Sequence, residues 1–109
     1  MTTNDSYSTA VALAYRDGQI APKVIAKGRG LIAQEIIRRA KEANIYVHES
    51  SELVALLMQV NLDDRIPPQL YVAVAELLAW LYRLEKAETT LVTANSLSSE
   101  IAQQTLEGN

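Results

Sequence analysis

Residues 7–15 read YSTAVALAY, and their side chains alternate between large and small. On an extended chain the large residues share one face, and these are Tyr7, Thr9, Val11, Leu13 and Tyr15. The small residues of the other face are Ser8, Ala10, Ala12 and Ala14. Because successive side chains of a strand point to opposite sides, this period of two predicts a β-strand whose small face lets a second layer approach closely.

A β-hairpin and a βαβ unit are predicted to follow this strand. Asp17 and Gly18 supply a turn, so residues 23–27 should form a second strand antiparallel to the first. Apolar residues then recur at helical spacing over residues 31–43, and residues 45–48 indicate a third strand, parallel to the second.

Gly28 and Gly30 stand between the second strand and the helix. The segment lacks both the Walker spacing and the dinucleotide fingerprint, so we interpret it as a turn that needs the backbone freedom of glycine. Asn44 is placed to end the helix in the left-handed conformation.

The C-terminal half predicts two more helices and a tail. Ser50 or Ser51 can cap a helix that reaches about residue 60, and two prolines at 67–68 open the longest helix, over about residues 69–87. Two adjacent apolar stripes lie on that helix: Leu70, Val74, Leu77, Leu81 and Leu84, and Tyr71, Ala75, Leu78 and Tyr82. Residues 88–109 are rich in Ser, Thr, Gln and Glu and are predicted to be a polar tail, disordered or a docking helix.

Together these elements predict an α/β (α+β-like) fold. We expect a small mixed sheet of three to four strands, with a β-hairpin followed by βαβ, packed by three to four helices. Residues 1–6 would be an N-terminal lead, residues 7–87 the domain and residues 88–109 the tail. A chain of 109 residues with 49% hydrophobic content suits one domain with a substantial core.

Composition excludes several classes of function. The 10 Lys and Arg residues against 13 Asp and Glu give a net charge of −3, which disfavours nucleic-acid binding. With no cysteine and one histidine, neither thiol catalysis nor a Cys- or His-rich metal centre is expected. No apolar run approaches the roughly 20 residues of a membrane span, and the first residues do not resemble a signal peptide. We therefore expect a cytoplasmic domain with no metal and no cofactor.

No set of residues has the pattern of an active site. Asp63 and Asp64 are adjacent in a loop, where their carboxylates should point apart rather than converge on a substrate. His48 has no partner cluster, and Ser50 and Ser51 are better explained as helix caps than as nucleophiles. We predict no catalytic residue and no small-molecule substrate.

A small basic run on the first helix contains Arg38, Arg39 and Lys41. Such runs are usually a solvated face, although this one could serve as a docking patch. Glu35 and Glu42 on the same helix dilute its positive charge.

Several runs of residues together carry a family resemblance. They are TAVALAY at 9–15, APKVIAKG at 21–28, GLIA at 30–33, IP at 66–67, QLY at 69–71, VAE at 74–76 and LAW at 78–80. In combination they resemble the C-terminal cytoplasmic domain of the FlhB/YscU export-switch family, and the flagellar FlhB branch more than the virulence-secretion branch. The resemblance spans roughly residues 9–86.

The resemblance implies a membrane-embedded component of bacterial type III export machines, whose cytoplasmic domain helps switch the export gate from rod- and hook-type to filament-type substrates. Family members cleave themselves at an Asn-Pro-Thr-His motif just before the first strand. The four matching positions here are Asp5, Ser6, Tyr7 and Ser8, and none keeps the motif. We therefore expect no self-cleavage, and a free-standing analogue of the fragment that cleavage would release.

The resemblance also implies an apolar pocket that receives a short hydrophobic segment of early export substrates. Its matching positions are Ala21, Pro22, Ala75 and Leu78. The expected function is a non-enzymatic component or accessory of flagellar type III protein export. Its partners would be export gate components and early export substrates, and its location the cytoplasm or the periphery of the inner-membrane export gate.

Two alternatives stay open at this point. The surplus apolar stripe could pack against the second strand or the tail instead of a partner. Separately, the chain could be a soluble regulator or decoy of the export gate, in which the tail occupies the chain's own pocket through Leu97, Ile101 and Leu106.

Overall fold

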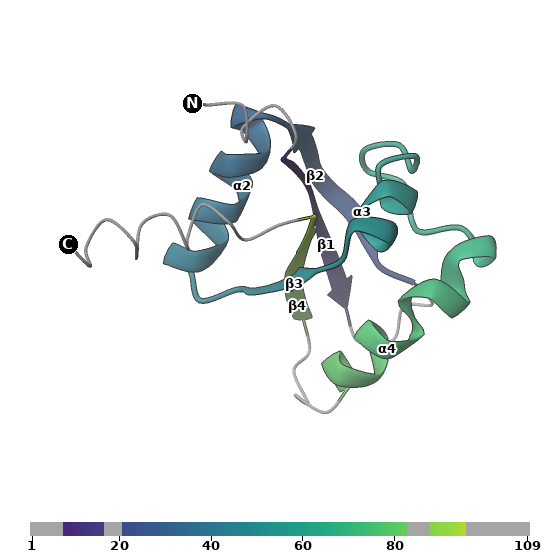
Figure 1. The fold of residues 1–109 in the computed structure, drawn as a ribbon. Helices are drawn as coiled ribbons and strands as arrows, with labels where there is room; N and C mark the ends of the chain where they lie inside the picture. Colours follow the sequence, from purple (N-terminus) through teal and green to yellow (C-terminus); the bar gives the residue numbers. More distant parts are fainter. Residues whose placement is uncertain (1–7, 17–20, 83–87, 96–109) are drawn as a thin grey trace.

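The alternating stretch at the N-terminus forms an interior strand of a four-stranded mixed sheet (Figure 1). The structure is a computed structural model that describes residues 8–16, 21–82 and 88–95. In chain order its elements are β1 (Thr9–Arg16), β2 (Lys23–Arg29), α2 (Leu31–Glu42), β3 (Tyr46–Glu49), α3 (Ser51–Leu57), the 3₁₀ turn η1 (Pro68–Leu70), α4 (Tyr71–Tyr82) and β4 (Glu88–Ala94). The predicted α+β class and mixed sheet are confirmed.

The strands lie in the order β2-β1-β4-β3. β1 is antiparallel to both β2 and β4, so the predicted hairpin of β1 and β2 is confirmed. β3 is parallel to β4 and therefore runs in the same direction as β2, as the βαβ pattern predicts. The two strands of that unit are not neighbours, however, because β1 and β4 lie between them.

The prediction of a polar tail from residue 88 is wrong for residues 88–95. This segment contains β4, and its residues Leu91 to Ala94 are at most 2% exposed. Threonine counts as polar in a composition, but its β-branched side chain favours strands, and Thr89, Thr90 and Thr93 all lie in β4. The rest of the predicted tail, residues 96–109, for which disorder and a docking helix are the two predicted alternatives, lies outside the described residues.

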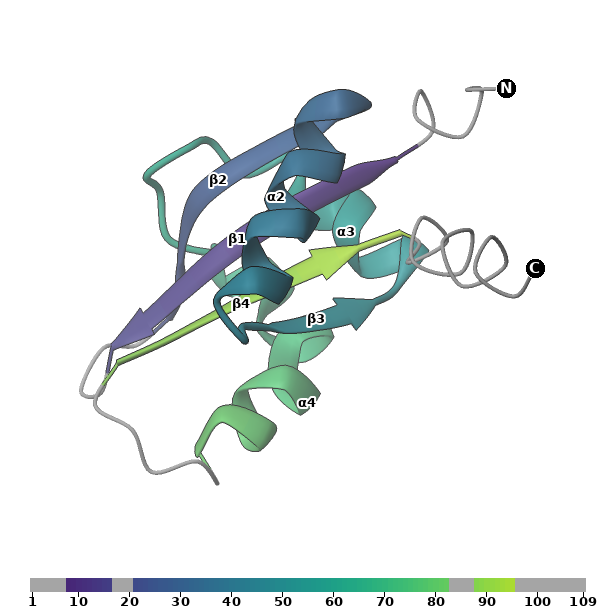
Figure 2. The ribbon, with the colours of Figure 1, turned by 90° about the vertical axis from the view of Figure 1, so that its left-hand side faces the viewer.

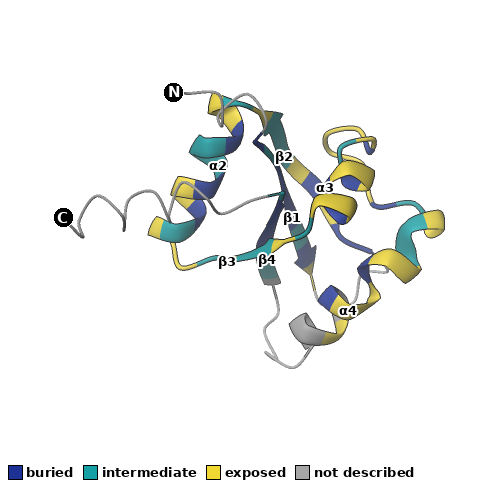
Figure 3. Ribbon diagram, in the orientation of Figure 1, coloured by how far each residue is buried: buried dark blue, intermediate teal, exposed yellow. Residues whose placement is uncertain are grey.

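Helices cover both faces of the sheet, α2 on one side and α3 and α4 on the other (Figures 1 and 2). The alternation of β1 sorts the two cores as predicted. The core beneath α2 is built largely from small residues: Ala10, Ala12, Ala33, Ile37, Ala40, Val92 and Ala94. The larger core opposite contains Val11, Leu13, Tyr15, Ala21, Val24, Leu53, Val54, Leu57, Val60, Ile66, Val74, Leu77 and Leu91. Figure 3 shows the burial of these strands.

The turns before and after α2 have the geometry that their residues predict. Gly30 has a φ of 63° at the N-terminal end of α2, and Asn44 has a φ of 60° just beyond its C-terminal end. A Cβ atom at Gly28 would collide with the side chain of Ile32, so this close approach requires glycine. Gly30 therefore forms the predicted strand-to-helix turn, whereas Gly28 lies within β2 and is required there by the close approach of Ile32, not by backbone freedom.

The cap of α3 is confirmed, and the longest predicted helix is divided. The Ser50 hydroxyl oxygen accepts a hydrogen bond from the backbone N–H of Leu53 at 3.1 Å. The predicted helix at about 69–87 begins instead as η1 and continues as α4, and residues 83–87 lie outside the described part of the chain. Across the residues that the structure describes, no helix combines the length and apolar character needed to cross a membrane.

Neighbouring leucines on α3 provide a direct test of the larger core. Leu57 is fully buried, whereas Leu56 is 37% exposed. Leu57→Ala should lower the free energy of unfolding by about 2–5 kcal/mol, because it removes buried contacts and leaves a cavity. Leu56→Ala, the matched control, should cost clearly less, about 1 kcal/mol, because its side chain is only partly buried. Urea unfolding measures both, and equal losses would contradict the placement of α3.

Candidate functional site

The Ala-Pro step before β2 lies beneath a loop. Ala21 is 1% exposed and Pro22 is fully buried. The backbone N–H of Ile66 donates to the carbonyl of Pro22 at 2.9 Å, so the loop that precedes η1 runs along the start of β2. Ile66 itself is 1% exposed and belongs to the larger core. Ala21 and Pro22 are thus core positions of the described structure.

The outer side of α4 exposes the apolar residues Val72 and Ala75 together with the charged Glu76. Val74 and Leu77 point into the larger core, while Ala75 is exposed and Val72 is 88% exposed. Leu78 lies within α4, but its side chain is outside what the structure describes. Of the four positions that the resemblance singles out, two therefore lie in the core and Ala75 lies on the surface.

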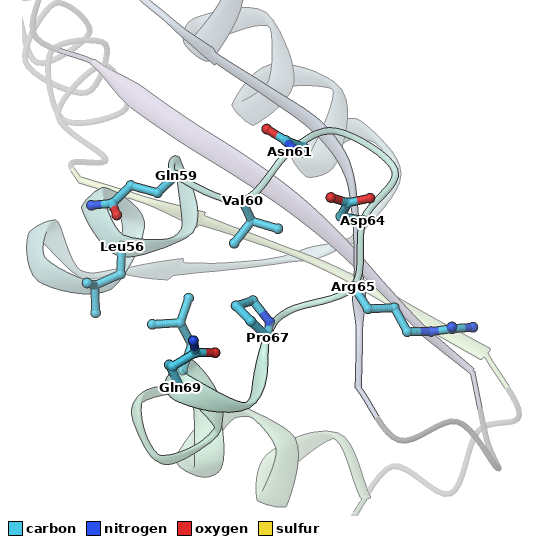
Figure 4. Close-up of a pocket in the computed structure, with 9 residues that line it drawn as sticks. Leu56, Gln59, Val60, Asn61, Asp64, Arg65, Pro67 and Gln69 are labelled. Carbon is cyan, nitrogen blue, oxygen red and sulfur yellow. The ribbon is translucent and has the colours of Figure 1, made fainter.

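A pocket of about 360 Å³ lies between the end of α3 and η1 (Figure 4). Its lining residues are Leu56, Gln59, Val60, Asn61, Asp64, Arg65, Pro67, Gln69 and Leu70. Its lining contains both apolar and polar side chains, so it offers both a hydrophobic surface and hydrogen-bonding groups. No sequence pattern indicates this pocket, because it forms only where α3, the loop after it and η1 meet in space, and its only local signal is the break at Pro67.

Lys27 holds one wall of this pocket in place. Its Nζ donates to the backbone carbonyls of Met58 at 3.0 Å and Val60 at 2.8 Å, just beyond the last turn of α3. The C-terminal end of a helix carries a partial negative charge, so an ammonium group is stabilised there. No sequence pattern indicates this contact, because Lys27 and its acceptors lie far apart in the chain.

The basic run on α2 is paired with carboxylates. Glu35 contacts Arg38 at 2.6 Å and Arg39 at 2.7 Å, and Arg38 also contacts Glu42 at 2.6 Å. The pKa of Glu35 is lowered from 4.5 to about 2, mainly by the hydrogen bond from Arg38 and next by the hydrogen bond from Arg39. Any stability from this carboxylate is therefore present above pH 4.5 and is lost as the pH falls toward 2. These mutual ion pairs favour a solvated face over a docking patch.

The other residues considered for catalysis or metal binding are not arranged as an active site in the described structure. Asp63 and Asp64 are both exposed, and their backbones bond to Val24 at the start of β2. Among the described residues, no group of three His, Cys, Asp or Glu side chains could hold a metal ion. His48 and Thr93 are register partners on β3 and β4, and the Nδ1 of the first and the Oγ1 of the second are buried without a hydrogen bond in the described structure. Each such unpaired group costs about 1–3 kcal/mol.

The positions that match the cleavage motif are only partly described. Asp5, Ser6 and Tyr7 lie outside the described residues, while Ser8 is buried beside the start of α2. The side-chain amide of Gln34 donates to the Ser8 hydroxyl at 2.6 Å, and the backbone N–H of Gly30 donates to its carbonyl at 2.9 Å. These bonds fasten the chain just before β1 to the helix.

Comparison with known proteins identifies the family. The model described as "FlhB HrpN YscU SpaS Family" matches residues 4–81. YlqH of Bacillus subtilis is 42% identical over 79 residues, which cover 72% of this chain and 85% of YlqH. The flagellar biosynthetic protein FlhB of Escherichia coli is 41% identical over 85 residues, which cover 76% of this chain but 22% of FlhB. The crystal structure of the PscU C-terminal domain has a TM-score of 0.62 and 35% identity, covering 67% of this chain and 95% of that domain.

The family model and the similarity to the PscU domain thus define the class of this chain as a C-terminal domain of the FlhB/YscU type. The chain belongs to the FlhB/YscU family, and the predicted resemblance to FlhB is confirmed. The chain matches less than a quarter of the length of E. coli FlhB, so the activity of whole FlhB proteins enters only as a proposal.

The contact of Lys27 with the end of α3 is open to direct test. Lys27→Met should lower the free energy of unfolding by about 1.5–3 kcal/mol, because two hydrogen bonds from a charged donor are lost. Lys23→Met, at an exposed position of the same strand, is the matched control and should change it by no more than about 0.5 kcal/mol. Urea unfolding of the two variants compares them. Similar losses would show that the ammonium group does not support α3.

Proposed function

We propose that this chain is a non-enzymatic, protein-binding component of the bacterial flagellar type III export apparatus that acts in substrate-specificity switching. Its membership of the FlhB/YscU family supports this proposal, together with its similarity to several flagellar biosynthetic proteins named FlhB. The proposed partners are early export substrates and components of the export gate. The proposed location is the cytoplasm or the periphery of the inner-membrane gate.

The observation that carries the proposal is the outward face of α4. Val72 and Ala75 present apolar side chains to solvent on this face, beside the exposed Glu76, although the helix already buries Val74 and Leu77 in the core. An exposed apolar surface beyond what the fold requires is typical of a protein-binding face. Figure 3 shows this exposed side of α4 turned away from the sheet.

In this proposal a short hydrophobic segment of a substrate binds beside Ala75, and the family resemblance adds Leu78 to the same contact. Ala21 and Pro22 contribute from beneath the surface, because Ala21 belongs to the same core as the inner residues of α4. They support the helix instead of touching the bound segment directly. The proposed contact thus keeps all four positions but gives them two different roles.

Binding of this kind should be weak and reversible. One or two apolar side chains inserted beside a helix must offset the entropy lost when two molecules associate. A substrate that is recognised only briefly before it is exported needs such a short residence time. The proposal includes no bond-making or bond-breaking step on the substrate.

Replacing Ala75 tests the proposed contact. An N-terminal peptide of a rod or hook protein should bind the Ala75→Asp variant at least tenfold more weakly than the unchanged chain, because the peptide would desolvate the new carboxylate. The exposed neighbour Ala73 points in a different direction on the same helix, so Ala73→Asp should stay within twofold. Fluorescence anisotropy measures the affinities, and circular dichroism checks that both variants are folded. Equal binding by all three chains would refute the contact.

A further inference from the structure

One of the two interior strands of the described sheet, β4, lies outside the part of the chain that the family model matches. That match ends at residue 81, whereas β4 spans Glu88–Ala94. Within the described sheet, β4 is the only neighbour of β3 and one of the two neighbours of β1. The matched segment by itself supplies β1, β2 and β3 and leaves a gap one strand wide between β1 and β3. Figure 2 shows β4 crossing the middle of the sheet.

The backbone of β4 is paired along both edges of this gap. Residues Ala10 to Arg16 of β1 face Ala94 to Glu88 in antiparallel register, and all four residues of β3 pair with Leu91 to Ala94 in parallel register. The far end is also fastened. The backbone N–H of Thr9 donates to the side-chain oxygen of Asn95 at 3.0 Å, and the backbone N–H of Asn95 donates to the carbonyl of Thr9 at 3.1 Å.

The side chains of β4 fill two different cores. Leu91 enters the larger core, while Val92 and Ala94 enter the small-residue core beneath α2. The gap therefore selects a strand with branched apolar residues at two consecutive positions and a small residue two places after the second. The fit is incomplete at Thr93, whose buried hydroxyl has no hydrogen-bond partner in the described structure. The unpaired hydroxyl makes the binding of this strand between β1 and β3 less favourable.

We propose that the gap between β1 and β3 is a strand-binding site and that residues 88–95 are its ligand, held in place by the chain that links them to α4. The site is made by the family-matched segment, whereas its occupant comes from sequence beyond that match. The same extended segment should therefore bind when it is supplied as a separate peptide. This proposal is independent of the proposed contact at Ala75.

A cut chain tests the proposal. A protease site is placed within residues 83–87 of the full chain, the purified protein is cut there, and the mixture is unfolded in urea. It is then refolded with a tenfold excess of a fluorescent peptide of residues 86–97. We expect most of the refolded protein to carry one labelled peptide, because peptide and fragment compete by mass action. A cut chain that does not refold with either segment, or that never takes up the peptide, overturns the proposal.

Matched peptides and chains make the result specific. The Val92→Asp peptide should be taken up at less than a tenth of the unchanged level, because its carboxylate would be buried in the core beneath α2. The Thr89→Ser peptide, changed at a half-buried position, should be taken up normally. The uncut chain should take up less than a tenth as much of the unchanged peptide as the cut chain does. Its own linked strand has a far higher effective concentration than the added peptide.

Equal uptake of the Val92→Asp peptide, or by the uncut chain, would place the peptide outside the gap and overturn the proposal. The Ala75→Asp variant of the cut chain should take up the strand normally. Failure of the strand site and failure of the substrate contact on α4 are therefore distinguished by separate results.

Discussion

The insertion of β4 between β1 and β3 is the constraint on which the rest of the fold depends. Its four consecutive buried residues, Leu91 to Ala94, are packed from both sides, and in the described sheet they join β3 to the β1–β2 hairpin. Leu91 belongs to one core and Val92 to the other, so this strand connects the two layers of helices. A buried backbone needs hydrogen-bond partners, and here both edges of the strand supply them.

The position of the helices follows from this sheet. The small face of β1 lets α2 approach closely, and the large face supports α3 and the inner side of α4. Once Val74 and Leu77 are buried, the opposite side of α4 is left exposed, with the apolar Val72 and Ala75 beside Glu76. A surface that the fold does not use is then available to a partner, which is why the proposed substrate contact lies on α4 and not at the buried Ala-Pro step.

Local patterns predicted the elements that local physics determines. The alternation in β1, the cap at Ser50 and the left-handed turn at Asn44 are properties of a few adjacent residues, and all three are confirmed. The short sequence motifs of the chain also identified its family correctly. The failure at β4 has a specific cause: its threonines were counted as polar, although the strand lies between two others and buries Thr93 completely.

The candidate site was less predictable because it depends on contacts between distant segments. The burial of Pro22 under Ile66 and the bonds from Lys27 to the end of α3 both join residues more than 30 positions apart, and neither leaves a periodic signal in the sequence. The pocket beside η1 likewise forms only when the loop folds back. Such features appear once the chain is assembled in space, and a one-dimensional pattern does not encode them directly.

Hydrogen exchange at the backbone amides of β4, followed by NMR on the unmodified chain, tests the central placement most directly. If β4 is an interior strand, the amides of Leu91 to Thr93 that bond to its neighbours should exchange as slowly as the bonded amides at the centre of β1. If they exchange at the rate of an unstructured peptide while those of β1 stay protected, β4 does not fill the gap and the account is contradicted.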